Sequence, residues 1–298
     1  MRNKFKSLIV LTSVGLLLTA CSASQTNQKT SKSSENTLTK KSALSNRKKA
    51  IAIIESFQTG DKSAFKKYVS SSQYIQHNLS VPDGRDVVMK NIEQLSKAGT
   101  KVKVVRSFED GNYVVLHSEY QIAGGDKQAG FDIFRFKDGK AVEHWDNLQT
   151  MGTNNPSGHT LLDGSTKVMD TKDTEQNKAL VKSFVETILV NKDLTKASDF
   201  FNGDNYIQHN PSTGDGVNTT IKGFQGLIDS NFDMQYQSIE KVLGSGNFVL
   251  VASQGTLMGQ PTAYYDLFRV ENGKIVEHWD TVDAIPSKDK WANQNGKF

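Results

Sequence analysis

The chain has 298 residues with one cysteine, and its 36 basic and 32 acidic side chains give a formal net charge of +4. A single cysteine excludes an internal disulfide framework, so any exported domain must be held together by apolar packing. Basic residues interleaved with aromatic ones are not found, which argues against nucleic acid as a partner. The positive excess lies before residue 50, and the remainder is mildly acidic.

Residues 1–20 have the features of a targeting segment. Three basic residues near the start are followed by an apolar run over 8–18, and small residues then lead directly to Cys21. The apolar run is typical of a signal peptide and is too short for a spanning helix. The order of these features resembles the lipobox of bacterial lipoproteins. The resemblance implies cleavage before Cys21, acylation of its thiol and anchoring at the extracytoplasmic face of the cell membrane. An ordinary signal peptide with an incidental cysteine is the alternative.

Residues 21–42 consist mainly of Ser, Thr, Lys, Gln and Asn. Such a stretch cannot bury enough apolar surface to offset the entropy lost on ordering, so we predict a flexible tether. Its positive charge would suit an anionic membrane surface or wall polymer. The same lysines would also serve simply to keep a tether solvated.

The remainder of the chain contains one pattern twice. Three sequence blocks recur in the same order and at nearly the same spacing: Tyr-Ile-Gln-His-Asn at 74–78 and 206–210, Asp-Ile/Leu-Phe-Arg at 132–135 and 266–269, and Glu-His-Trp-Asp at 143–146 and 277–280. A period this long indicates two whole domains rather than a solenoid. The predicted organisation is a first domain at 43–150, a linker at 151–174, a second domain at 175–286 and a C-terminal tail at 287–298.

In the first domain the pattern predicts helices first and strands afterwards. Ser45 is a candidate N-cap for a helix that ends at Gly60, a short helix follows Asp61, and an amphipathic helix covers 87–95. Strand-like runs punctuated by Asp-Gly turns then occupy 101–108, 113–122, 130–136 and 141–150.

The second domain repeats this order. Helices are expected near 177–190, 194–201 and 219–232, and strands follow them. Helices succeeded by a run of antiparallel strands are typical of an α+β fold in which the helices cover one face of a curved sheet.

The order of elements, the Tyr-Ile-Gln-His-Asn block and the closing hairpin that ends in Glu-His-Trp-Asp resemble the SnoaL-like branch of the nuclear-transport-factor-2-like superfamily. The resemblance covers most of both domains and implies two tandem cone-shaped α+β barrels, each with a pocket between sheet and long helix. Members include polyketide cyclases that perform an intramolecular aldol condensation, isomerases, dehydratases and proteins without a known reaction. The fold alone therefore does not define the function.

The resemblance also implies an acid/base aspartate near the end of the last strand, which would be Asp146 and Asp280. Side chains two residues apart on a strand share a face, so His144 accompanies Asp146 and His278 accompanies Asp280. A desolvated aspartate can remove a proton next to a carbonyl, while the histidine orients it or donates to the enolate oxygen. Such chemistry needs no metal or organic cofactor, and none is expected. A structural hydrogen bond within each pair is the alternative.

The position of Asp132, and of its counterpart Asp266, depends on the register of the closing hairpin. A simple two-residue turn at 138–139 would place Asp132 opposite Trp145, facing away from the pocket. A three-residue turn with a glycine bulge would place it opposite His144, as a pocket residue. The sequence leaves both registers open.

Other candidate pocket residues come from the first strand and from neighbouring positions. His77 and His209 would reach the pocket if the family arrangement holds, and a metal site of two histidines and one carboxylate is then a weaker alternative. Trp145 and Trp279 are candidates for ligand contact, with a place in the core or at a domain interface as the other interpretation. His117, which has no histidine counterpart in the second domain, is either a pocket residue or an ordinary strand residue.

Three functions are compatible with these features. One is an enzyme of the aldol, isomerase or dehydratase type that uses Asp146, Asp280 or both. Another is a membrane-tethered module that binds an apolar small molecule or a wall component without catalysis, which export favours. The third is an interaction protein that pairs through its sheets, as a homodimer or between its own two domains. Nucleotide-binding loops, nucleophile elbows and zinc-protease helices are not found.

Overall fold

The computed structural model describes residues 44–152 and 155–298. The expected signal peptide, the tether and the acylated Cys21 lie outside the described residues. Within the described part of the chain, no helix combines the length and the apolar character needed to cross a bilayer. The described residues from 44 onwards belong to one compact unit, so the contacts between the two predicted domains lie within a single folded body.

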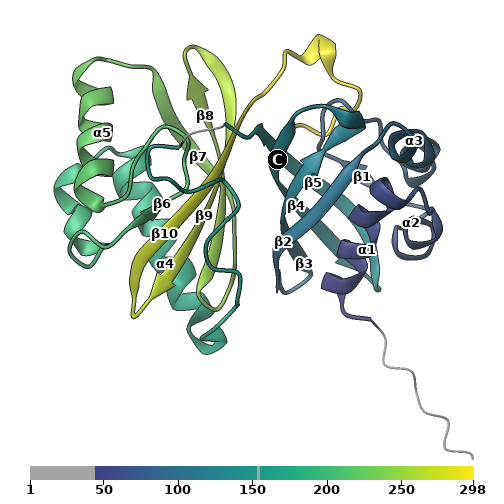
Figure 1. Cartoon of the computed structure of the whole chain (residues 1–298), viewed down its shortest axis with the longest axis horizontal. Coiled ribbons are helices and arrows are strands. Elements are labelled where there is room, and N and C mark those ends of the chain that lie inside the picture. Colours follow the sequence, from purple (N-terminus) through teal and green to yellow (C-terminus); the bar gives the residue numbers. More distant parts are fainter. Residues whose placement is uncertain (1–43, 153–154) are drawn as a thin grey trace, which may run out of the picture. The chain divides into compact units, whose positions relative to one another are not determined.

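The first domain has three helices and a five-stranded sheet (Figure 1). The helices are α1 (Asn46–Thr59), α2 (Ser63–Tyr68) and α3 (Arg85–Lys97), with a short 3-10 turn η1 (Ile122–Gly124). The strands are β1 (Ile75–Gln76), β2 (Lys101–Asp110), β3 (Tyr113–Gln121), β4 (Lys127–Lys137) and β5 (Lys140–Thr150). Their order is β1-β5-β4-β3-β2; β1 runs parallel to β5, and the other neighbours are antiparallel.

The second domain repeats this topology as β6-β10-β9-β8-β7. Its helical elements are η2 (Thr171–Asp173), α4 (Thr174–Phe184), the π-helical η3 (Val185–Val190), η4 (Leu194–Asp199), α5 (Val217–Asp229) and η5 (Lys288–Lys290). Its strands are β6 (Ile207–Gln208), β7 (Met234–Ser245), β8 (Phe248–Leu257), β9 (Gln260–Glu271) and β10 (Lys274–Ala284).

The predicted α+β fold with two tandem domains is confirmed, but the expected barrels are not closed. Each sheet is open, with a long strand at one edge and a two-residue strand, β1 or β6, at the other. A strand of two residues offers too short a hydrogen-bonding ladder for the opposite edge to close upon it.

Local sequence explains where the first helix begins and ends. The Ser45 hydroxyl accepts a hydrogen bond from the backbone N–H of Lys48 at 3.3 Å, as an N-cap does. Gly60 adopts the left-handed conformation, with φ of 76°, and its N–H donates to the Ser56 carbonyl. The predicted limits of this helix are therefore confirmed.

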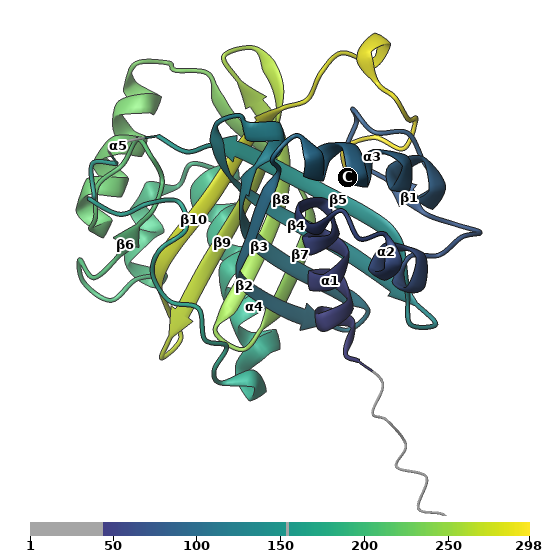
Figure 2. The ribbon, with the colours of Figure 1, turned by 45° about the vertical axis from the view of Figure 1, so that its right-hand side comes forward.

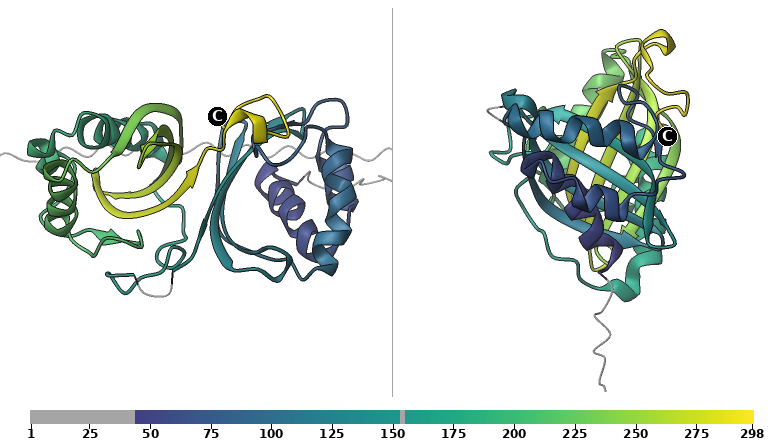
Figure 3. Two further views of the ribbon diagram at one scale, coloured as in Figure 1. Left: turned by 90° about the horizontal axis from the view of Figure 1, so that it is seen from above. Right: turned by 90° about the vertical axis from the view of Figure 1, so that its right-hand side faces the viewer.

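Helices cover the concave face of each sheet, as Figures 2 and 3 show. In the first domain, Ile53 of α1, Phe65 of α2 and Ile92 of α3 are buried in one cluster with Leu116 and Phe134 of the sheet. The second domain has an equivalent cluster beneath α4 and η3. Full burial of each such side chain contributes about 1.5–3 kcal/mol, so these clusters are the main source of stability of each domain.

The faces of the two sheets that point away from the helices share one apolar cluster. Trp145 and Phe131 of the first domain are buried in it together with Trp279 and Tyr265 of the second. At its centre the amide of Asn147 donates hydrogen bonds to the carbonyl and hydroxyl oxygens of Thr281, at 2.8 and 3.0 Å. The duplicated sheets thus bury each other's outer faces within one chain.

The segment after each last strand contacts the other domain. In the linker, the Asn155 amide donates to the His209 carbonyl at 3.0 Å. In the C-terminal tail, the Asn293 amide donates to the carbonyls of Asn78 and Val81 at 2.8 and 2.9 Å. Each domain is therefore fastened to its neighbour by the chain that leaves it.

Candidate active site

Each closing hairpin brings two aspartates and a histidine to the concave face of its sheet. Asp132 lies directly opposite Asp146, and Asp266 lies directly opposite Asp280. Residues opposite each other on paired strands point to the same face of the sheet, and so does the residue two positions along either strand. In the second domain His278, two positions before Asp280, therefore shares the face of both aspartates. All these side chains are buried.

The register that produces this cluster differs from both registers considered from the sequence. Asp138 and Gly139 have φ of 50° and 73° and form a two-residue turn between Lys137 and Lys140. An extra residue in β5, just beyond the turn, then shifts the pairing by one position. Asp132 is consequently opposite neither Trp145 nor His144, because the bulge lies within the strand rather than in the turn.

The histidine of the second domain is held at both ring nitrogens. His278 Nδ1 donates to the side-chain oxygen of Gln208 at 2.8 Å, and His278 Nε2 lies 3.0 Å from Asp266 Oδ1. Burial lowers the pKa of His278, but the hydrogen bond that His278 donates to Asp266 and the charges of Asp280 and Asp266 outweigh it, so the pKa is raised. Two acceptors around one ring favour the imidazolium form.

Asp280 has the properties of a proton carrier. Burial, reinforced by the charge of Asp266, raises the pKa of Asp280 from 3.8 to about 6, against the opposing effects of His278 and of the hydrogen bond from Asn210. The Asn210 amide donates to Asp280 Oδ2 at 2.5 Å. Oδ1 of Asp280 and Oδ2 of Asp266 are buried and have no hydrogen-bond partner among the described residues. A carboxyl group with a pKa near neutrality and a free oxygen can accept and return a proton.

These groups line a cavity of about 610 Å³ between the sheet and the helices of the second domain. The polar part of its wall includes Tyr206, Gln208, Asn210, Ser212, Thr213, Thr220, Tyr236, Tyr264, Asp266, His278 and Asp280. Its apolar part includes Phe184, Leu189, Phe224, Leu227, Phe232, Met234, Leu257, Met258, Phe268 and Val282. The first domain contributes Gln149, which accepts a hydrogen bond from the backbone N–H of Val282 at 2.8 Å. An apolar enclosure with a few convergent polar groups is the usual form of a small-molecule site.

The first domain contains the same polar cluster. His144 Nδ1 donates to Gln76 at 2.9 Å, and His144 Nε2 lies 3.1 Å from Asp132 Oδ1. Asn78 donates to Asp146 Oδ2 at 2.7 Å. Burial raises the pKa of Asp132, although hydrogen bonds from His144 and Tyr120 oppose the shift.

The two domains differ in the tyrosine that reaches the cluster. In the first, the Tyr120 hydroxyl on β3 donates to Asp132, and the Tyr120 ring packs on Gly130, where an added Cβ would lie 3.0 Å away. In the second, Tyr236 of β7 donates to Asp266 at 3.3 Å. The residue that corresponds to Tyr120 there is Gly255, so no ring projects into the second domain from that position.

His77 and His209 do not reach the cavity, which corrects the prediction for both. His77 Nε2 lies 2.9 Å from Glu143 Oε1, and its ring stacks on Trp145 with centroids 4.7 Å apart. His209 repeats this arrangement with Glu277, at 3.0 Å, and with the second tryptophan. Gln76 is paired with His144, so His77, the residue directly after β1, points to the opposite face.

Trp145, Trp279 and His117 are also directed away from the cavity, contrary to their assignment as ligand contacts. Both tryptophans are buried in the cluster shared by the two sheets. His117 is buried with its ring stacked on Phe131 of that cluster, and its Nδ1 accepts a hydrogen bond from Arg106 at 2.6 Å. Burial and the charge of Arg106 lower the pKa of His117, so this ring is neutral and structural.

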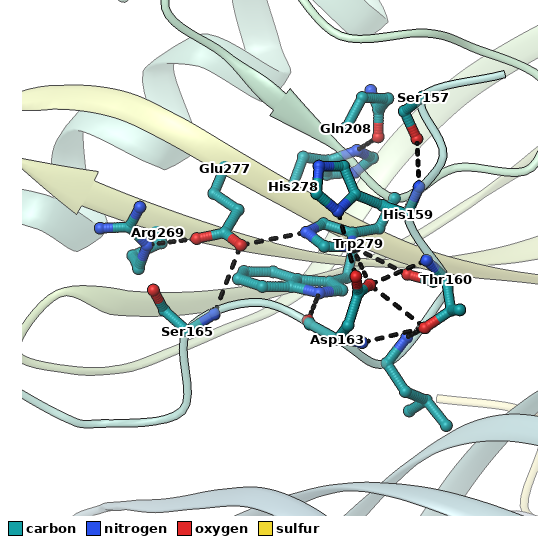
Figure 4. Close-up of polar contacts among 12 residues, drawn as sticks. Ser157, His159, Thr160, Asp163, Ser165, Gln208, Arg269, Glu277, His278 and Trp279 are labelled. Atoms are coloured by element: carbon teal, nitrogen blue, oxygen red, sulfur yellow. Dashed lines mark hydrogen bonds and ion pairs between the residues drawn. The ribbon is translucent and has the colours of Figure 1, made fainter. Parts of the chain in front are cut away.

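Sequence reasoning missed Gln76 and Gln208, the residues that orient the two cavity histidines. Both belong to the repeated Tyr-Ile-Gln-His-Asn block, and Figure 4 shows Gln208 beside His278. The alternation of side chains along that block places its tyrosine and glutamine on one face, but the sequence does not say which face borders the cavity.

Two groups of side chains have a composition suitable for a metal ion. In the cavity, ligand atoms of Asp266, His278 and Asp280 lie within 4.8 Å of one another. A cation bound there at His278 Nε2 would displace the hydrogen bond between this nitrogen and Asp266. The second group lies on the opposite face of the sheet and includes His159 and Asp163 (Figure 4).

Comparison with known families matches the SnoaL-like domain at residues 50–144 and 181–278. No curated protein matches the sequence. Among solved structures, an NTF2-like protein of unknown function from Cytophaga hutchinsonii is 19% identical, with 37% of this chain and 94% of that protein covered and a TM-score of 0.32. An LEH-like epoxide hydrolase from M. tuberculosis is 16% identical, with 35% and 82% covered and a TM-score of 0.32. TsrD from Streptomyces laurentii is 18% identical, with 36% and 92% covered and a TM-score of 0.30. The chain therefore belongs to the SnoaL-like domain family and contains this domain twice.

Proposed function

We propose that the second domain binds a small, largely apolar molecule with a carbonyl group and that Asp280 exchanges a proton at the carbon next to this carbonyl. The observation that carries the proposal is the cavity of about 610 Å³ with Asp266, His278 and Asp280 in its wall. Apolar side chains suit the body of the ligand, and the polar cluster suits its carbonyl end.

The proposed proton transfer uses the two charged forms that the site favours. Above pH 6 the Asp280 carboxylate is mainly ionised and accepts the proton, while the electrons of the broken C–H bond move onto the carbonyl oxygen. The His278 imidazolium stabilises this enolate oxygen as a hydrogen-bond donor. Return of the proton to another carbon completes an isomerisation. Alternatively, the enolate carbon attacks a second carbonyl, and the alkoxide oxygen formed there takes the proton held by Asp280, which completes an aldol reaction.

The first domain is proposed to act mainly as a scaffold. Its Tyr120 ring packs over Gly130, and the Tyr120 hydroxyl donates to Asp132. This ring therefore occupies space next to the polar cluster. It supplies Gln149 to the wall of the neighbouring cavity and buries the outer face of the second sheet. The duplication would thereby stabilise one binding domain by a copy of itself.

Binding can be tested with 2-tetralone, an apolar ketone with acidic protons next to its carbonyl, by saturation-transfer NMR on the full chain. Gly223 lines the cavity, and a Cβ added there meets no atom within 4 Å, so Gly223→Leu should fill the cavity and abolish the signal. Gly226→Leu is the matched control, because Gly226 lies on the same helix, equally free of neighbours and outside the cavity wall. Equal signals from both variants would contradict binding in the cavity.

Catalysis can be tested by following deuterium incorporation into the same ketone in D₂O. Asp280→Asn should lower the protein-dependent exchange rate by about 100-fold or more, which is the usual contribution of a positioned acid/base group. Asp146→Asn, the same change in the first domain, should leave the rate nearly unchanged. Binding without protein-dependent exchange would instead support the alternative of a non-catalytic binding module.

We further propose that the protein is a lipoprotein held at the extracytoplasmic face of the membrane by acyl chains on Cys21. The charged start, the apolar run and the small residues before this lone cysteine support the proposal. Labelling of cells with radioactive palmitate should mark the protein, and Cys21→Ala should remove both the label and the association with membranes. Retention of both in the variant would exclude this anchor.

A further inference from the structure

Two histidines and a carboxylate meet on the sheet face opposite the cavity, where the linker crosses the second domain (Figure 4). His209 Nδ1 lies 2.9 Å from Asp163 Oδ1, and His159 Nδ1 lies 3.0 Å from Asp163 Oδ2. The carbonyl oxygen of Thr160 is 2.8 Å from the same His209 nitrogen. Ligand atoms of the three ionisable side chains all lie within 4.8 Å of one another.

The environment of His209 matches that of a metal-binding histidine. Its other nitrogen, Nε2, lies 3.0 Å from Glu277 Oε1, and Glu277 is held in turn by Arg269. Metal-bound histidines usually donate their second N–H to a carboxylate in this way, which fixes the ring and increases its basicity. The His209 ring is also stacked on Trp279, with centroids 4.6 Å apart, so its orientation is fixed on both counts.

The linker residues of the cluster are fixed by their backbone. The Asp163 carbonyl accepts hydrogen bonds from Arg106 at 2.7 Å and from the Trp279 indole at 2.9 Å. Arg106 also donates to the carbonyls of Leu162 and Ser165, each at 3.0 Å. Preorganised ligands of this kind bind a metal ion without the entropy cost of ordering a loop.

The cluster is open to solvent on the linker side only. The side chains of His159 and Asp163 are 33% and 45% exposed, whereas that of His209 is fully buried. A hydrated ion can therefore enter from solvent and reach the buried ring. Asp215, whose carboxylate lies 3.6 Å from His159 Nε2, adds negative charge at this entrance.

The equivalent position in the first domain does not offer these ligands to its histidine. His77 has the same carboxylate partner and the same stacked tryptophan, but its Nδ1 meets the backbone carbonyl of Gly296 in the C-terminal tail. The linker and the tail thus cover equivalent histidines with different groups. The tail places a backbone carbonyl on His77, whereas the linker places the side chains of His159 and Asp163 beside His209.

We propose that His159, Asp163 and His209 form a site for a divalent transition-metal ion of the Zn²⁺ type, which fastens the linker to the second domain. Imidazole nitrogens and a carboxylate oxygen are ligands that Zn²⁺ accepts, and water or the Thr160 carbonyl can occupy the fourth position. The coordinating nitrogens must be unprotonated, so Zn²⁺ binding should weaken as pH falls.

The test is calorimetric titration of ZnCl₂ into the full chain, in detergent and after treatment with a chelator. One Zn²⁺ should bind per chain, more weakly as pH falls, and should raise the melting temperature. Glu277→Gln should raise the dissociation constant by about 10–100-fold, the usual effect of losing the carboxylate partner of a ligand. His159→Ala removes a ligand itself and should have a larger effect, and since His159 is partly exposed the variant should fold.

Two matched variants assign the site. His77→Ala alters the equivalent histidine of the first domain, and Asp280→Asn alters the cavity group; both should retain Zn²⁺ binding. The proposal is overturned if the chain binds no Zn²⁺, if His159→Ala and Asp163→Asn both bind it as the unaltered chain does, or if Asp280→Asn abolishes binding, which would place the ion in the cavity.

Discussion

Replacement of Asp280 by Asn should change how the stability of the protein depends on pH. The folded state raises the pKa of this buried carboxyl from 3.8 to about 6. Between these values the folded chain keeps a proton that the unfolded chain releases, so stability falls as pH rises through this window. At about 1.4 kcal/mol for each pH unit, the ionised carboxylate makes the folded state about 3 kcal/mol less stable at pH 7 than at pH 3. The amide in Asp280→Asn can still accept the hydrogen bond from Asn210 but does not titrate.

The assay is urea unfolding of both proteins at a series of pH values from 3 to 8. The variant should gain stability relative to the unaltered chain by about 3 kcal/mol across this range, with the steepest change between pH 4 and 6 and a plateau above pH 7. The charge of Asp280 also raises the pKa of His278, so the difference between the two curves contains this coupled change together with the titration of Asp280 itself. Asp146→Asn shows how much change follows from losing an aspartate at the matched position. Parallel curves for Asp280→Asn and the unaltered chain would refute the reasoning.

Two other substitutions test the contacts that hold the linker. Arg106→Met leaves the carbonyls of Leu162 and Ser165 without their donor and removes one of the two donors to the Asp163 carbonyl, so it should lower the free energy of unfolding by about 3 kcal/mol or more, measured in urea. Lys241→Met, which removes a cation stacked on Trp145 at 4.4 Å, should cost much less, and similar losses would refute the role of the hydrogen bonds. Gly246→Ala places a Cβ 1.8 Å from the Met169 carbonyl, whereas Gly111→Ala, at a similar positive φ in the first domain, meets no atom within 4 Å. Both should lose about 1 kcal/mol through backbone strain, and Gly246→Ala about 1–3 kcal/mol more through overpacking, which thermal unfolding would measure.

The duplication and the order of elements could be predicted because both depend on local sequence. Repeated blocks, the Ser45 cap and the Asp-Gly turns are visible without knowledge of long-range contacts. That His144 and Asp146 point to the same face also follows from the sequence, because side chains alternate between the two faces along a strand. The partner of this pair, Asp132, depends on a bulge of one residue, and any residue can occupy the extra position of such a bulge. Its location therefore had to come from the structure.

The direction of His77 could not be derived from the sequence alone. Strand β1 is two residues long, so it has no alternation of polar and apolar residues that would identify its buried face. Its face is fixed by parallel pairing with β5, a contact between segments far apart in the chain. Trp145 and His117 were misplaced for a related reason, since both faces of β3 and β5 are buried and burial alone does not distinguish the cavity from the shared cluster.

The difference between the domains follows from where each carries a glycine beside its polar cluster. In the first domain Gly130 gives space to the Tyr120 ring, whose hydroxyl donates to Asp132. In the second, Gly255 stands at the position of Tyr120, and a Cβ added to it would collide with the backbone carbonyl of Gln235 at 1.7 Å. Strand β7 therefore approaches β8 closely at this point, and its Tyr236 reaches Asp266 from the edge of the sheet. In the first domain the tyrosine that contacts the polar cluster is Tyr120, on β3. In the second domain this tyrosine is Tyr236, in the cavity wall, and Asp266, His278 and Asp280 border the cavity.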